Sequence, residues 1–145
     1  MLRRYLQKNR IEAGCDEVGR GCLSGPVYAA AVILPKNYRN KNLKDSKLMT
    51  PEDRAKLSEE IKRKAISWSI ARLTPSEIDQ INILQASFKA MHIAVSKLDS
   101  RPEHLLIDGN RFVPFPGISH TCIIKGDNKL LPIAAASVLA KHARD

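Results

Sequence analysis

The sequence predicts an α/β domain with a mixed central sheet flanked by helices. Two apolar runs at the start of the chain flank a glycine-containing turn, as two adjacent strands do. After them, segments with strand and helix patterns alternate along the chain. The 145 residues are 43% hydrophobic, which is enough for one compact core. We therefore expect residues 1–145 to form a single domain.

The first strand pair is predicted from two apolar segments. Residues 11–16, IEAGCD, lead as a short strand into the glycine turn. Residues 26–34, PVYAAAVIL, form a continuous apolar run bounded by Gly25-Pro26 and Pro35, which is typical of a buried strand. Residues 38–48 have no periodicity and many polar side chains, so they are expected to form an exposed connection.

Helix-start signals mark the middle of the chain. Thr50 followed by Pro51 predicts a helix that reaches about Lys64. Residues 65–73 alternate as a strand does, with Ile66, Trp68 and Ile70 on one face. Residues 74–77, TPSE, form a capping box that opens a further helical region, and residues 82–97 have the spacing of a longer helix with a small-residue face.

The last third of the chain predicts two short strands and a helix. Residues 104–108, HLLID, and residues 120–125, HTCIIK, are the strands. Residues 131–145 form an alanine-rich helix with Pro132 near its start.

Charge and cysteine content restrict the partner and the compartment. The chain has 24 Lys and Arg against 15 Asp and Glu, a net charge of +9 that favours nucleic acid as the partner. A solvated basic face is the alternative. The three cysteines have no CxxC spacing and follow no apolar signal segment, so we expect a reduced, cytoplasmic setting and no zinc site.

Acidic residues stand where predicted strands end. Asp16 and Glu17 close the first strand, Asp108 follows HLLI, and Asp127 follows TCII. Strand ends of one sheet can gather such carboxylates, which repel one another unless a cation neutralises them, and oxygen-rich sites of this kind suit Mg²⁺ or Mn²⁺. Adjacent strand residues point to opposite faces, so we expect a backbone distortion that lets Asp16 and Glu17 address one site. Ordinary turn chemistry is the alternative for each acid.

Five sequence blocks together resemble one enzyme family. They are AGCDEVGRGCLSGPVYAAAVIL, LKDSKLMTPEDRAKL, INILQASFKAMHIAV, LLIDGN and KGDNKLLPIAAASVLAKHARD. In this order they resemble type 2 ribonuclease H and, more closely, its bacterial form, ribonuclease HII. The resemblance runs from about Ile11 to the last residue.

The resemblance implies a ribonuclease H-like fold and an activity. The activity is metal-dependent endonucleolytic cleavage of RNA in RNA/DNA hybrids, including single ribonucleotides embedded in duplex DNA, which leaves 5′-phosphate and 3′-hydroxyl ends. It also implies Mg²⁺ or Mn²⁺ as the cofactor, a hybrid or ribonucleotide-containing duplex as the partner, no membrane association and a monomer. The family's catalytic, metal-binding acids match Asp16, Glu17, Asp108 and Asp127.

The resemblance also implies substrate-binding residues. Gly19, Arg20 and Gly21 match the motif that reads the ribose 2′-hydroxyl. Lys47, Ser137 and Lys141 match positions that contact backbone phosphate. A solvated loop is the alternative for Lys47, and a small packing residue is the alternative for Ser137.

The end of the chain departs from the family pattern. We expect Asp145 to lie on the helix surface or to pair with Arg144 rather than bind a metal. Family members usually continue with a segment that carries a tyrosine beside the 2′-hydroxyl, and we expect this chain to lack that segment. A hybrid-binding module with impaired catalysis is therefore an alternative function, and another phosphoryl-transfer enzyme of the same fold is a third.

Overall fold

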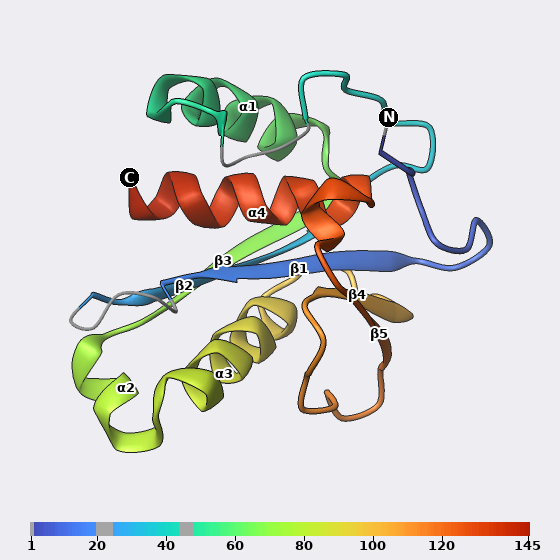
Figure 1. Ribbon diagram of the computed structural model, residues 1–145. Coiled ribbons are helices and arrows are strands. Elements are labelled where there is room, and N and C mark those ends of the chain that lie inside the picture. Colours follow the sequence, from blue (N-terminus) through green and yellow to red (C-terminus); the bar gives the residue numbers. More distant parts are fainter. Residues whose placement is uncertain (1, 20–24, 44–47) are drawn as a thin grey trace.

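A mixed five-stranded sheet carries helices on both of its faces (Figure 1). The structure is a computed structural model and describes residues 2–19, 25–43 and 48–145. The elements are β1 (Glu12–Val18), β2 (Val27–Ile33), α1 (Pro51–Lys64), β3 (Ser67–Leu73), α2 (Pro75–Ile81), α3 (Ile83–Ser96), β4 (His104–Asp108), β5 (Ser119–Ile123), the short 3-10 helix η2 (Gly126–Asn128) and α4 (Leu131–Arg144).

The strand order is β3-β2-β1-β4-β5, so the first strand is the central one. β1 pairs antiparallel with β2, and β2 with β3, whereas β1 pairs parallel with β4, and β4 with β5. The expected mixed sheet is therefore confirmed. Since β1, β4 and β5 run in the same direction, their carboxyl ends meet at one edge, where the acids stand.

The two faces of the sheet are covered by different helices. α3 packs on one face through small residues that allow close approach, namely Ala86, Ala90 and Ala94. α4 packs on the other face, with α1 beside it (Figure 1). Gly14 of β1 makes this second contact possible, because a Cβ at Gly14 would lie 2.2 Å from the Pro132 carbonyl carbon.

The predicted helix starts are confirmed by hydrogen bonds. Thr50 and Asp53 form a reciprocal capping box before α1, and Thr74 and Glu77 form another before α2. These signals lie within four residues of each other, so the sequence alone is enough to place them.

The face predicted from Ile66, Trp68 and Ile70 is not the face of β3 that packs under α3. Ile66 is 59% exposed and Trp68 is 38% exposed, whereas Ser67 and Ser69 are buried. The two serines are satisfied there, because the Ser69 hydroxyl donates to the Ala94 carbonyl and the Ser67 hydroxyl accepts from the Asp99 N–H at 3.0 Å. Small, hydrogen-bonded residues allow α3 to approach β3 closely.

Cys15 is fully buried, as expected of a small apolar residue, and burial raises the pKa of its thiol. Cys22 lies outside the described residues. Across the part of the chain that the structure describes, no helix has both the length and the apolarity needed to cross a membrane.

Candidate active site

Two of the predicted acids meet where β1 and β4 end. The parallel register pairs Cys15 with Ile107, so the next residues, Asp16 and Asp108, lie side by side. Their carboxyl groups are within hydrogen-bonding distance, and Asp16 is only 6% exposed. Burial, and then the charge of Asp108, raises the pKa of Asp16 well above its ordinary value, against the effect of the Glu17 N–H, which donates to Asp16 Oδ1 at 2.8 Å. The site therefore favours a proton or a cation between the two acids.

A tight turn brings the backbone before the third predicted acid, Asp127, into contact with this pair. Lys125 has a left-handed backbone conformation (φ 55°), and η2 follows it at once. The Gly126 N–H donates to Asp108 Oδ1 at 2.7 Å, which fixes the orientation of that carboxylate. A Cβ at Gly126 would lie 2.6 Å from Ile133 Cδ1, so the turn packs closely on α4. Asp127 comes directly after Gly126 and is buried.

Glu17 leaves β1 on the opposite face from Asp16. β1 pairs regularly with β2 through Glu17, opposite Ala29, and Val18, opposite Tyr28. The distortion expected between Asp16 and Glu17 is therefore absent from β1. Regular pairing keeps the alternation, and the backbone changes course only at Gly19, with φ 122°.

In this structure the four acids, Asp16, Glu17, Asp108 and Asp127, do not together form a metal-binding group. The Glu17 charge does reach Asp16, because it contributes to the raised pKa of that acid. Within residues 2–19, 25–43 and 48–145, however, no group of three or more His, Cys, Asp and Glu side chains is arranged to hold a metal ion. The convergence of all four acids on one ion stays a prediction, whereas the close Asp16–Asp108 pair is a feature of the structure.

The chemistry of this pair fits a hard divalent cation. Two carboxyl groups in contact, one of them buried, supply the oxygen atoms that Mg²⁺ and Mn²⁺ prefer. Replacing the proton between them by a cation would remove the repulsion that raises the pKa of Asp16.

Most of the predicted substrate-binding residues flank this edge or lie outside the described residues. Gly19 lies within the described residues and has a positive φ, which favours glycine. A Cβ at this position would lie 2.7 Å from the Pro26 carbonyl oxygen. Arg20, Gly21 and Lys47 lie outside the described residues.

The two predicted phosphate-contacting residues of α4 have different exposure. Ser137 is 1% exposed, which agrees with its alternative interpretation as a packing residue. Lys141 is half-buried one helical turn further along α4. Both roles stay predictions.

Asp145 pairs with a residue of another helix. Its carboxylate accepts two hydrogen bonds from the Arg54 guanidinium, at 2.7 Å from Nε and 2.9 Å from Nη2. Asp145 is exposed at the end of α4, as one of the two expectations had it, but its partner is Arg54 and not Arg144. Arg54 is buried on α1, and a bidentate arginine contact is stronger than one to an exposed neighbour. The pair links the last turn of α4 to α1.

Sequence reasoning missed two residues that hold α4 in place. Gly14 allows α4 to lie directly on β1, two residues before Asp16. Its signal was an isolated glycine inside a strand pattern, which indicates close backbone approach. Arg54 had no signal, because its partner is 91 residues away in the sequence.

Known proteins are similar to this chain over most or all of its length. The family model described as Ribonuclease HII matches residues 13–145. Proteins named Ribonuclease HII from Parabacteroides distasonis and Bacteroides thetaiotaomicron are 59% and 61% identical over 145 residues, which is 100% of this chain and 73% and 72% of theirs. The crystal structure of the ribonuclease H2 from Pyrococcus horikoshii OT3 superposes with a TM-score of 0.78 at 26% identity, covering 92% of this chain and 72% of that one.

Proposed function

The chain belongs to the ribonuclease HII family, and we propose that divalent cations held at the edge of its sheet support the cleavage of RNA paired with DNA. As a family member the chain is a ribonuclease H, which confirms the resemblance seen in the sequence and the ribonuclease H-like fold. The residues proposed to hold the cations are Asp16, Glu17, Asp108 and Asp127.

One observation carries this proposal. Asp16 and Asp108 bring two carboxyl groups together at the edge of the sheet, where burial and like charge raise the pKa of Asp16. Such contact destabilises the two charges unless something positive lies between them. A fold that needed these residues only for structure would gain by an amide at either position.

The chain's own groups prepare the site for a phosphodiester. Bound divalent cations supply a nucleophilic water and stabilise the attacking and leaving oxygens. The Gly126 N–H holds the Asp108 carboxylate in one orientation, and the Glu17 N–H does the same for Asp16. With water as the nucleophile, no protein nucleophile would be needed. If the P–O bond to the 3′ oxygen breaks and this oxygen takes up a proton, the products carry 5′-phosphate and 3′-hydroxyl ends.

Recognition of the ribonucleotide is proposed for the glycine turn after β1. Gly19 already adopts a backbone conformation that brings it close to the Pro26 carbonyl. With Arg20 and Gly21 it would present backbone amides to the ribose 2′-hydroxyl, the group that distinguishes RNA from DNA. Single ribonucleotides embedded in DNA are then substrates as well as longer hybrids, and either Mg²⁺ or Mn²⁺ serves.

A cleavage assay tests the proposal. The substrate is a DNA duplex with one embedded ribonucleotide, offered with Mg²⁺, with Mn²⁺ and with chelator. We expect cleavage beside the ribonucleotide with either metal, none with chelator, and a loss of about 10³-fold in Asp108→Asn. Asp79→Asn, an exposed acid on α2, is the matched control and should keep the wild-type rate.

Two outcomes would contradict the proposal: full activity in chelator, or an Asp108→Asn variant as active as the control. Tight binding of the duplex without turnover would instead favour the hybrid-binding module. The comparisons do not favour that module, because the relatives that match over the whole chain are named as ribonucleases. An all-DNA duplex offered in competition tests the third possibility, a different nuclease of this fold.

A further inference from the structure

A basic cleft lies between the N-terminal leader, residues 2–11, and the loop that follows β2. Its volume is about 280 Å³, and its lining contains three cationic side chains and no acidic one. The lining residues are Leu2, Arg4, Arg39, Asn40, Lys41 and Leu131. A neighbouring hollow of about 240 Å³ shares Leu2, Arg4 and Arg39 and adds Arg3 and Tyr5. We call the two hollows together the leader cleft.

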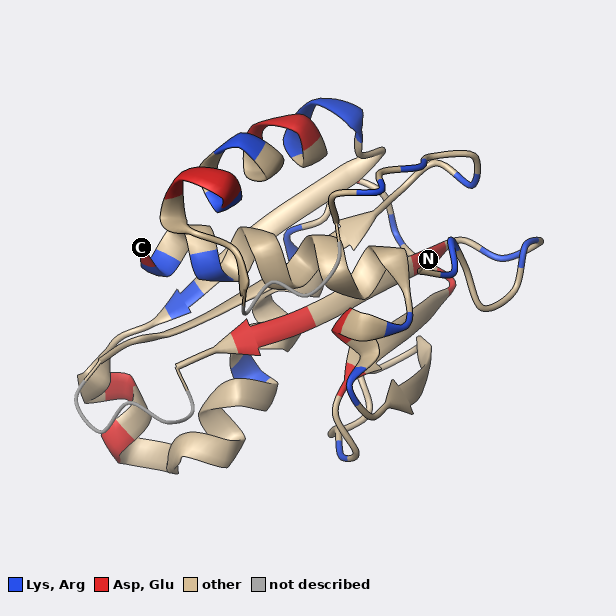
Figure 2. Cartoon of the chain, turned by 45° about the horizontal axis from the view of Figure 1, so that its top comes forward, with Lys and Arg blue, Asp and Glu red and all other residues tan. Residues whose placement is uncertain are grey.

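The cations of the leader cleft are not neutralised by the described acids. The ion pairs among residues 2–19, 25–43 and 48–145 use Arg10, Lys36 and Arg54 instead. Arg39 and Lys41 are exposed, and Arg4 lies over the Tyr5 ring at 5.7 Å from its centroid. Positive charge gathered with no ion-paired acid among the described residues favours an anionic ligand. In Figure 2 Lys and Arg segments mark both the leader and this loop, close to the N-terminus.

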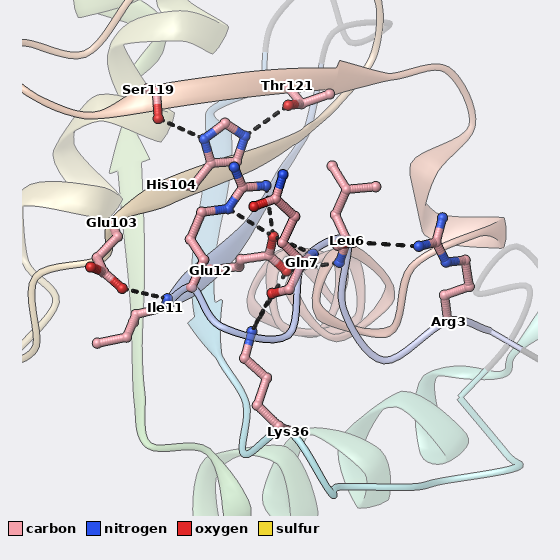
Figure 3. A network of polar contacts seen from close by, with 11 residues as sticks. Arg3, Leu6, Gln7, Ile11, Glu12, Lys36, Glu103, His104, Ser119 and Thr121 are labelled. Carbon is pink, nitrogen blue, oxygen red and sulfur yellow. Dashed lines mark hydrogen bonds and ion pairs between the residues drawn. The ribbon is translucent and has the colours of Figure 1, made fainter.

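The leader forms one wall of the cleft and is held in place by hydrogen bonds. The Arg3 N–H donates to the Lys129 carbonyl at 2.9 Å, and the Leu131 N–H donates to the Arg3 carbonyl at 2.7 Å. The buried Glu12 carboxylate accepts from the Leu6 N–H at 2.8 Å and from the Gln7 N–H at 3.0 Å (Figure 3). The leader backbone is therefore ordered before any ligand arrives, which lowers the entropic cost of binding.

The leader cleft also lies close to the candidate metal site. Leu131 lines the cleft and follows Asp127 by four residues. Four residues span at most about 14 Å, and each strand of a DNA duplex carries one phosphate per ~3.4 Å of helix axis. The nearest wall of the cleft is thus within about four nucleotide steps of the acids. A duplex lying across the acids extends beyond this distance.

From these observations we infer that the leader cleft binds backbone phosphates of the duplex that flanks the cleavage site. The inference rests on the proposed function. An open cleft with several cations and an aromatic ring suits a chain of phosphates, because each cation can neutralise one phosphate and release its counterions. Arg39 and Lys41 are the main contacts, with Arg4 as a third.

The test varies the length of duplex DNA on each side of the ribonucleotide. Three duplexes each contain one ribonucleotide: a short one, and two that extend it by about eight base pairs on one side or the other. kcat and KM are measured at several salt concentrations for the wild type and for Arg39→Gln combined with Lys41→Gln. Lys89→Gln combined with Arg101→Gln removes the same two charge types from exposed positions outside the cleft and is the matched control. Thermal melting checks that each variant is folded.

We expect one of the two extensions to raise kcat/KM for the wild type and for the control. The Arg39 and Lys41 variant should lose this gain, by about tenfold at 0.1 M salt and chiefly through KM, with a salt slope less steep by about 2. Arg39→Lys combined with Lys41→Arg keeps both charges and should restore the gain.

Equal gains from extension in the wild type and the Gln variant, or no gain in either, would overturn the inference. Cleavage of the short duplex would then leave the proposed function standing. If the wild type cleaves none of the three duplexes, the proposed function fails and the inference falls with it.

Discussion

At its first residue β1 buries the Glu12 carboxylate among donors, whereas near its other end it buries Asp16 against a second carboxyl group. Glu12 accepts from two backbone N–H groups and from Arg10, and Lys36 Nζ lies 3.7 Å away (Figure 3). Asp16 accepts one backbone N–H and otherwise faces Asp108. The same strand thus holds one carboxylate that faces donors and cations and one that, among residues 2–19, 25–43 and 48–145, faces another carboxyl group.

We interpret this difference as one between a structural acid, Glu12, and the proposed cation ligand, Asp16. The donors around Glu12 tie the leader to the sheet, so the charge serves the fold. Asp16 costs free energy as it stands, and such strained electrostatics are typical of sites that bind a cation or catalyse a reaction. Substitutions at the two ends should therefore have opposite effects on stability and activity.

The largest expected effect is at the functional end. Asp16→Asn should reduce cleavage by about 10³-fold or more, because a cation ligand is lost. Its free energy of unfolding without added metal should equal or exceed that of the wild type, since a carboxyl next to Asp108 is removed. Single-turnover cleavage and urea unfolding measure the two quantities. A destabilised variant that cleaves within tenfold of the wild type would reverse the assignment.

The second effect is expected midway along β1. A Cβ at Gly14 would lie 2.2 Å from the Pro132 carbonyl carbon and 2.5 Å from the Ile133 nitrogen, so Gly14→Ala must push α4 off the sheet. We expect a loss of about 3 kcal/mol in the free energy of unfolding. Urea denaturation checks this. Ala29→Gly, on the neighbouring strand, is a control for backbone flexibility and should cost less. Wild-type stability in Gly14→Ala would mean that α4 does not need this contact.

The third effect is expected at the structural end. Glu12→Gln keeps the shape of the side chain but places an NH₂ group among donors, so it should lower the free energy of unfolding by about 2 kcal/mol. Glu103→Gln, an exposed neighbour before β4, provides the control. At a temperature where both variants are folded, divalent-cation affinity should match the wild type. A Glu12→Gln variant with normal stability but weakened metal binding would contradict the structural role of Glu12.

The smallest effect concerns the link between α4 and α1. The Arg54 hydrogen bonds lower the pKa of Asp145 below its ordinary value of 3.8. The pair therefore stabilises the chain fully above about pH 4, and this stabilisation is lost as pH falls through the folded pKa. Asp145→Asn should cost about 1 kcal/mol at pH 7, and the difference from wild type should shrink as the pH falls below the ordinary pKa of an aspartate. Urea titrations at several pH values measure it, and a pH-independent difference would exclude the ion pair as the cause.

The sequence was most informative where the determining residues are close together. The helix start at Thr50 depends on a few neighbouring residues, and both this start and the end of the helix near Lys64 were predicted correctly. The alternation in residues 67–73 showed a strand but not that its serines are buried under α3, because that depends on hydrogen bonds to α3 and to Asp99. The Arg54–Asp145 pair joins residues 91 positions apart and leaves no local pattern.

The Asp16–Asp108 pair of the candidate site was predictable from the sequence, whereas the path of the backbone around it was not. Apolar runs that end in acids indicated which carboxylates lie at one edge of the sheet, and the parallel pairing of β1 with β4 brings Asp16 and Asp108 together. The expected break between Asp16 and Glu17 was wrong, since backbone pairing with β2 holds the strand regular through Val18. The backbone adopts a positive φ, which glycine tolerates, only two residues after Glu17, at Gly19.

Direct titration of the chain with Mn²⁺, followed by electron paramagnetic resonance, is the most direct test of the strand-end acids as a cation site. We predict saturable binding to the wild type and to Glu12→Gln, weakened at least tenfold in Asp16→Asn and in Asp108→Asn. Equal affinity in all four proteins, or no saturable binding to the wild type, would contradict the account.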